Sequence, residues 1–202
     1  MEVRFVAVAT ADRRYLSERT DIGAVIKQGA VWGVIAAAVM AMYAMVAGAT
    51  YLNAGFFTPL YHIASSVIPP DTMMTSMKSS MENQNIFHFV LGPAMVGMMI
   101  HLTTGAIFGI VFALIARAAR LSGVVTMAIG AAFGIAAMFF SSFVGLPAAA
   151  ALFGGGDPIA DMPKVVGWTT FTIEHVIFGM VLGLGWLVAQ RRWAASEREV
   201  RS

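Results

Sequence analysis

Four long segments without lysine, arginine or aspartate constrain the fold of this chain more than any other feature. Each reaches or exceeds the ~20 residues that an α-helix needs to cross the hydrocarbon core of a bilayer. Only Glu174 places a carboxylate inside them. The composition agrees with a membrane protein, since 58% of the residues are hydrophobic and 12% are charged. The four segments are 28–49, 86–116, 124–153 and 165–189.

The sequence therefore predicts an all-α fold, a polytopic membrane four-helix bundle with short helices in its first outer loop. Transmembrane spans are expected at about 28–49, 88–116, 124–150 and 165–189, with the outer loop at 50–86. The membrane domain would cover 24–191, between an N-terminal segment 1–23 and a tail 192–202.

The distribution of basic residues predicts the orientation. Of the 13 lysines and arginines, only Lys78 and Lys164 lie in the connections that follow the first and third spans. Because positively charged loops are retained in the cytoplasm, both termini are expected there, with the protein in the plasma membrane. The net charge of +2 is then a signal of topology and gives no reason to expect nucleic-acid binding. The lipid bilayer is the expected partner, and a homo-oligomer or a partner in a membrane complex stays open.

A repeat relates the second span to the fourth. HLTTGAIFGIVFALIAR begins at His101 and HVIFGMVLGLGWLVAQR begins at His175, and both read H-x3-G-x3-G-x2-[FW]-x4-R. The aromatic position is Phe112 in one and Trp186 in the other. The repeat predicts two tandem helical hairpins related by an axis along the membrane normal. Chance recurrence of Gly, Phe and Ile in apolar helices is the alternative.

Every span also contains a G-x3-G pair. Residues four apart share one helix face, and the missing side chains let two helix backbones approach closely where lipid supplies no hydrophobic drive. The pairs predict a tightly packed bundle. They are Gly29 with Gly33, Gly105 with Gly109, Gly130 with Gly134, and Gly179 with Gly183.

His101, Glu174 and His175 form the candidate site. Each histidine precedes the arginine at the end of its motif by 16 residues, which is roughly 24 Å along a helix and predicts matching depths in the outer part of the membrane. Glu174 lies about 100° around the helix from His175, so its expected partner is on another span, such as His101. Ionisable groups at this depth indicate a site for a metal ion, a proton or a small solute. A polar belt that fixes helix register is the alternative.

The first outer loop contains two predicted short helices. Thr58 and Pro59 are typical of an N-cap and a first helical position, and the helix that follows would place His62 over the mouth of the bundle. A second helix is expected to begin near Asp71 or Thr72.

Methionines on this second helix are secondary candidates. Met73, Met77 and Met81 share one face, and their thioethers, with His62 and His88 nearby, suit Cu(I). Apolar packing or an interfacial face is the more common reason for such a stripe.

Haem is a further alternative. His88 and His101 are 13 residues apart on one predicted helix, a spacing that resembles haem-ligating pairs in membrane b-type cytochromes. Only His175 offers an axial partner, opposite His101, so a single haem is the most that the sequence allows.

Enzyme motifs are absent from the sequence. It has no cysteine, no H-E-x2-H, no G-x-S-x-G and no phosphate-binding glycine loop, and no nucleophile stands beside a base. Catalysis is therefore the weaker hypothesis, and no catalytic residue is predicted.

The chain also resembles a known group of proteins. IHLTTGAIFGIVFALIARA and FTIEHVIFGMVLGLGW, on either side of a Gly-rich third span, resemble an uncharacterised group of small four-helix membrane proteins from bacteria and archaea. Members carry H-x3-G near the start of the second and fourth spans. The YagU-like inner-membrane proteins are distantly similar and place an acid and a histidine in the last span. The resemblance covers roughly 24–190 and implies four helices in the plasma membrane, without an established activity.

Three functions follow, in order of preference. The first is an outward-facing intramembrane His/Glu site that binds or transports a metal ion, a proton or a small solute. The second is a structural or assembly subunit of a membrane complex without catalytic activity. The third is a b-type haem protein.

Overall fold

The computed structural model describes residues 21–201, and all regular secondary structure within them is helical. Four helical segments are long and apolar enough to cross a membrane. The prediction of an all-α bundle with four spans is therefore confirmed, and the chain is a multi-pass membrane protein. The spans are α2 (Ile22–Ala49), α5 (Leu91–Ala118), the segment Val125–Phe153, and the apolar part of α10 (Trp168–Arg201).

The helix bounds differ from the sequence prediction at several ends. The first span begins at Ile22, six residues before the predicted start, and the last helix continues beyond Ala189 through the charged tail. A helix does not stop where the bilayer core ends, because its backbone hydrogen bonds continue in water. The predicted N-terminal segment lies mostly outside the described residues.

The third span is interrupted by a wider turn. It consists of α6 (Val125–Phe140), a π-helical turn η1 (Ser141–Gly145) and α7 (Leu146–Phe153). Pro147 stands in the first turn of α7. A proline lacks the amide hydrogen and its ring crowds the preceding turn, so a local widening of the helix accommodates it.

The four spans form two hairpins. α2 packs mainly against α5, and α6 mainly against α10, while contacts between α2 and α10 join the two pairs. Glycines lie where the two helices of each hairpin meet. A Cβ added to Gly33 would overlap the backbone of Gly105, and a Cβ added to Gly130 would overlap the backbone of Gly179. Each hairpin is therefore held by direct backbone contact between helices, which only glycine permits here.

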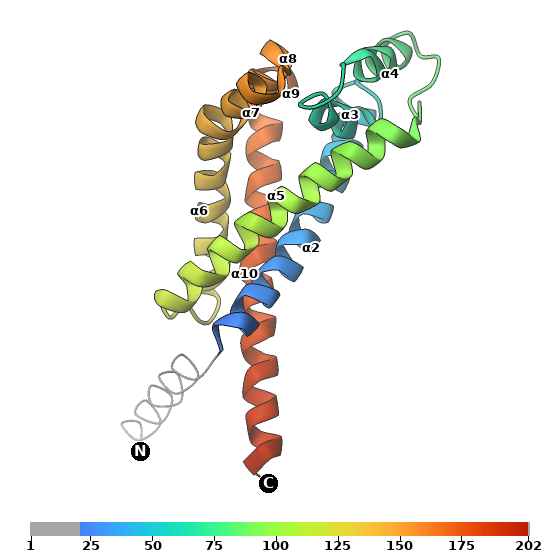
Figure 1. Cartoon of the computed structure of the whole chain (residues 1–202). Helices are drawn as coiled ribbons and strands as arrows, with labels where there is room; N and C mark the ends of the chain where they lie inside the picture. Colours follow the sequence, from blue (N-terminus) through green and yellow to red (C-terminus); the bar gives the residue numbers. More distant parts are fainter. Residues whose placement is uncertain (1–20, 202) are drawn as a thin grey trace.

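The two ends of the bundle differ. α2 begins and α10 ends at the same end, which we name the terminal end (Figure 1). α5 runs obliquely across the bundle and moves away from α6 toward the opposite end (Figure 1), in agreement with the sparse contact between these two helices. The helices at that opposite end, which we name the capped end, are α3 (Thr58–Ala64), α4 (Asp71–Met81), α8 (Gly156–Ala160) and α9 (Met162–Val166).

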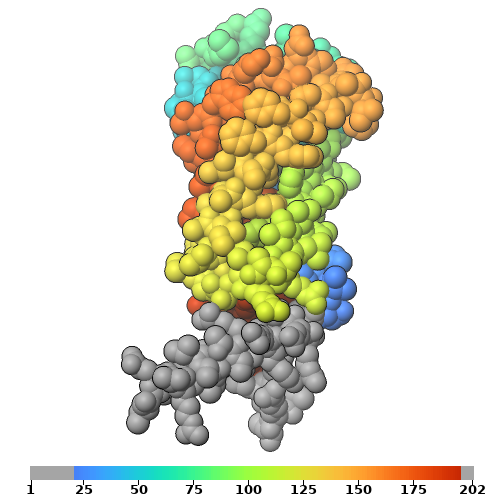
Figure 2. All heavy atoms as spheres, turned by 90° about the vertical axis from the view of Figure 1, so that its left-hand side faces the viewer, coloured from blue at the N-terminus to red at the C-terminus, as the bar shows by residue number. Residues whose placement is uncertain are grey.

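The caps come from the two connections that follow the first and third spans. Figure 2 shows the orange segment that contains α7, α8 and α9 at the same end of the molecule as the cyan segment of α3. α4 begins at Asp71, as the sequence predicts. The expected N-cap at Thr58 is wrong by one position, since Phe57 is the N-cap and the Thr58 hydroxyl instead donates to the carbonyl of Ala54. The helices α8 and α9 were not predicted.

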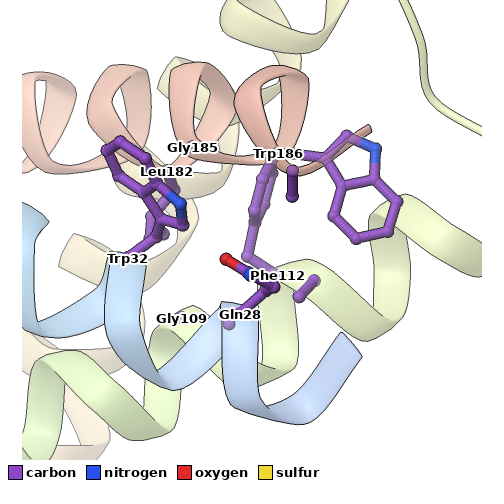
Figure 3. Close-up of a pocket in the computed structure, with 10 residues that line it drawn as sticks. Gln28, Trp32, Gly109, Phe112, Leu182, Gly185 and Trp186 are labelled. Atoms are coloured by element: carbon purple, nitrogen blue, oxygen red, sulfur yellow. The ribbon is translucent and has the colours of Figure 1, made fainter. Parts of the chain in front are cut away.

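The terminal end is closed by large side chains. Figure 3 shows Trp32 and Trp186 on either side of Phe112, with only a small pocket of about 10 Å³ among them. That space is about one water molecule. Trp186 also donates a hydrogen bond of 3.0 Å from Nε1 to the carbonyl of Leu121. A larger cavity lies toward the capped end.

Candidate intramembrane binding cavity

A cavity of about 430 Å³ lies between the two hairpins, toward the capped end. It is bounded by residues of α2, α5, α6, η1, α7 and α10 and by residues of the caps. Its volume is in the range of small-molecule sites, which are typically about 300–1,000 Å³. The lining is mainly apolar, and its polar side chains are Thr58, His62, Ser66, His101, Thr104, Ser141, Glu174 and His175.

Among the described residues, Glu174 is the only acid in this lining, and no lysine or arginine lines the cavity. It lies in the second turn of α10, with 5% of its surface exposed. Its Oε1 has no hydrogen-bond partner. Buried polar atoms are nearly always satisfied, so an unpartnered carboxyl oxygen in a residue that lines a cavity points to an interaction that the protein alone does not supply.

His101 reaches the cavity from α5. Its Nε2 lies 3.0 Å from the carbonyl oxygen of Ala37 on α2. Because a carbonyl oxygen only accepts hydrogen bonds, Nε2 carries the hydrogen and donates it. In the neutral ring Nδ1 is then an acceptor without a protein partner.

His175 reaches the cavity from α10 with the opposite nitrogen bound. Its Nδ1 donates to the carbonyl oxygen of Phe171, one turn earlier in the same helix, at 2.7 Å. The Phe171 ring packs beside the imidazole, with 4.5 Å between the ring centroids. The neutral ring therefore keeps Nε2 as its free acceptor.

The structure brings the three sequence-predicted residues to one cavity but does not pair them. His101 and His175 line the same space, and their imidazoles are near enough to interact electrostatically. The expected pairing of Glu174 with His101 is not formed, because the imidazole donates to Ala37 and Oε1 of the carboxyl stays unpartnered. The result is a set of hydrogen-bond acceptors with free lone pairs inside an apolar space.

The arrangement does not suit a metal ion. Among the side chains that the structure describes, those of residues 21–196, no group of three or more from histidine, cysteine, aspartate and glutamate is close enough together to hold one. His101, Glu174 and His175 share the cavity without forming such a cluster. A tightly held structural or catalytic ion generally needs at least three protein ligands, so a small solute fits these side chains better.

His62 closes part of the capped end. It is 4% exposed, and its Nε2 donates at 2.7 Å to the carbonyl oxygen of Pro158. This bond ties α3 to α8 across the mouth of the cavity. Burial lowers the pKa of the His62 imidazole below its ordinary value of 6.5, and the bond to Pro158 acts in the opposite direction.

The methionines and His88 lie in separate environments. Met73 is buried in a cluster with Met45, Leu60, Tyr61 and Ala94. Met77 packs against that cluster and also lines the cavity, whereas Met81 is 68% exposed. His88 precedes α5, and its carbonyl oxygen accepts a hydrogen bond from Tyr61. The structure supports packing for Met73 and Met77, and the Cu(I) hypothesis stays a prediction.

Sequence reasoning missed two tyrosine hydroxyls that join Thr170 near Glu174. The hydroxyls of Tyr43 and Tyr51 lie 3.1 Å apart, and that of Tyr51 lies 3.1 Å from Oγ1 of Thr170. Thr170 is one turn before Glu174 on α10. The spacing of the two tyrosines is the one available signal, but the contact with α10 depends on how α2 ends.

No family model, curated protein or solved structure matches this chain. The resemblance to small four-helix membrane proteins and to the YagU-like proteins therefore stays a hypothesis based on short motifs. The geometry of the cavity is therefore the main evidence on function.

Proposed function

We propose that this protein is a plasma-membrane protein whose cavity opens toward the outer side and binds a small solute, with both termini in the cytoplasm. The positions of the lysines and arginines support that orientation. The observation that carries the binding function is the Glu174 carboxyl, buried against a cavity of about 430 Å³ with an unpartnered oxygen. His101 and His175 add two free acceptors, so the polar groups of the site are set to receive a ligand.

The difference in cavity volume between the two ends of the bundle supports binding at the capped end. The terminal end holds a pocket of about 10 Å³, whereas the cavity is large enough for a small organic molecule. Glycine contacts close each hairpin tightly, so the space does not arise within a hairpin. It arises between the hairpins, where α5 diverges from α6. A cavity that packing could have filled is costly to keep unless something occupies it.

Ligand-dependent thermal stability tests the proposal. The protein in nanodiscs would be heated with a panel of C10 probes: a neutral alcohol, an amine and a carboxylate. Occupancy at 100 times the dissociation constant stabilises a protein by about 2.7 kcal/mol, so a ligand raises the midpoint of unfolding. At least one probe class is expected to do so in the wild type.

Substitutions on one helix provide the control. Ala44→Phe places a ring into the cavity, since Ala44 lines it, whereas Met42→Phe adds a similar ring at an exposed position of the same helix. Probe-induced stabilisation is expected to disappear in Ala44→Phe and to persist in Met42→Phe. Equal stabilisation of both variants would place the effect in the surrounding lipid and reject the cavity as the site.

A structural role is the second candidate function. Its support is that both histidines already donate to backbone carbonyls, as the members of a polar belt would. Under this hypothesis the outer helices and exposed span faces would bind a partner, and substitutions of His101, Glu174 and His175 would change stability without changing ligand binding.

A further inference from the structure

His101, Glu174 and His175 each bring a hydrogen-bond acceptor to the cavity. Nδ1 of His101 and Nε2 of His175 have lone pairs available, and the unpartnered Oε1 belongs to a carboxyl group. A ligand that complements them donates hydrogen bonds and tolerates a negative neighbour. Building on the proposed binding function, we infer that the occupant is an amphipathic amine, with its ammonium head at Glu174 and its hydrocarbon body in the cavity.

The charges around the cavity favour a cation over an anion. No lysine or arginine from the described part of the chain lines it, so no fixed positive charge there would compensate the carboxylate of a fatty acid or a phosphate. A buried ammonium ion, in contrast, has an acid as its partner at Glu174. Aromatic faces add to this preference, because they attract cations within about 6 Å. The aromatic residues in the lining are Phe108, Phe140, Phe171 and Phe178.

The rest of the lining suits a hydrocarbon body. Alanine, isoleucine, leucine, methionine and valine side chains from both hairpins make up most of it. They supply no hydrogen-bond donors or charges, so they suit the apolar part of a ligand. This arrangement separates one polar head from one apolar body, as in a primary alkylamine.

The divergence of α5 from α6 gives such a ligand a route from the lipid. Thr104 on α5 and Phe140 at the end of α6 both line the cavity and are exposed at the surface of the bundle. At the capped end, the bond from His62 to Pro158 joins α3 to α8 over the cavity. An amphipathic molecule dissolved in the outer leaflet would therefore enter sideways, between the hairpins.

The proton balance of this entry is simple. A neutral primary amine that crosses lipid takes the proton of the Glu174 carboxylic acid, and its nitrogen lone pair forms the new N–H bond. An ammonium ion that arrives charged pairs with the carboxylate without proton transfer. Both routes give the same ammonium–carboxylate pair, and no other reactant is needed.

Direct binding of tritiated 1-decylamine to the full-length protein in nanodiscs tests the inference. Unlabelled 1-decanol, which has the same chain but no charge, serves as the competing probe. Ala44→Phe gives the background from partition into lipid, and Met42→Phe controls for an added ring on α2. Glu174→Gln keeps the shape of the side chain and removes its charge, and its melting temperature would be measured first to show that it folds.

Saturable binding to the wild type, at least about tenfold weaker in Glu174→Gln and weakly displaced by decanol, is the expected result. If decanol displaces decylamine equally well and Glu174→Gln binds normally, the amine inference is overturned while the cavity remains a binding site. If decylamine shows no binding above Ala44→Phe, the inference is also overturned. The proposed function itself then fails only if the whole C10 panel leaves the melting temperature unchanged.

Discussion

Replacement of Glu174 by methionine is expected to stabilise the protein. This result would distinguish a binding site from a polar belt that stabilises the fold. The carboxyl is 5% exposed and its Oε1 has no partner. A buried polar atom without a hydrogen bond costs about 1–3 kcal/mol. Methionine has a similar length, is apolar and adapts to irregular space. Glu174→Met should therefore raise the free energy of unfolding by about 1–3 kcal/mol and abolish amine binding.

Unfolding of the purified protein by SDS in mixed micelles, followed by helical circular dichroism, measures this change. Glu174→Gln is the matched control, because its amide is as polar as the acid and leaves the same burial problem unsolved. We expect the control to stay within about 0.5 kcal/mol of the wild type. A loss of more than about 1 kcal/mol in Glu174→Met would mean that the carboxyl has a stabilising partner, and the binding argument would be refuted.

Three further predictions concern packing, pH and cofactors. Gly134→Ala should destabilise the protein by about 1–3 kcal/mol, because its Cβ would overlap the carbonyl of His175, whereas Gly92→Ala meets no neighbouring atom and should be neutral or slightly stabilising in the same SDS assay. Burial lowers the pKa of His62 in the folded protein, so the unfolded chain takes up this proton first when the pH is lowered below about 6.5. The protein should therefore lose stability as the pH decreases, and His62→Gln should flatten this profile in thermal unfolding. Elemental analysis of gently purified protein should show no stoichiometric metal, since no third ligand joins His101 and His175 among the described side chains; its absorption spectrum tests the haem hypothesis separately, and a Soret band would support haem instead.

Much of the architecture follows from the sequence because lipid imposes simple rules. Long apolar segments in lipid form helices because each helix satisfies its own backbone hydrogen bonds. The four spans could therefore be predicted without knowledge of any tertiary contact. The repeated motif also predicted that His101 and His175 reach a common region, and both line one cavity. These predictions depend on local periodicity, which the order of residues records directly.

The cavity itself could not be predicted in this way. It exists because α5 diverges from α6, and that angle depends on how all side chains between the hairpins pack together. The hydrogen-bond partner of His101 could not be predicted for the same reason. Its imidazole donates to the carbonyl of Ala37 and not to Glu174, and no sequence pattern marks a backbone carbonyl as a partner. The π-helical turn before Pro147 likewise depends on a balance of local strain and packing.

The pattern of hydrogen bonds argues against a belt whose purpose is to hold the bundle together. Such a belt would join the two hairpins, but His101 bonds to α2 within its own hairpin and His175 bonds within its own helix. Glu174 could bridge the hairpins and leaves an oxygen unpartnered instead. The contact between α2 and α10 includes a polar bridge elsewhere, from Tyr51 to Thr170. Because these three groups add no connection between the hairpins, their convergence on a cavity is better explained by a ligand than by the stability of the fold.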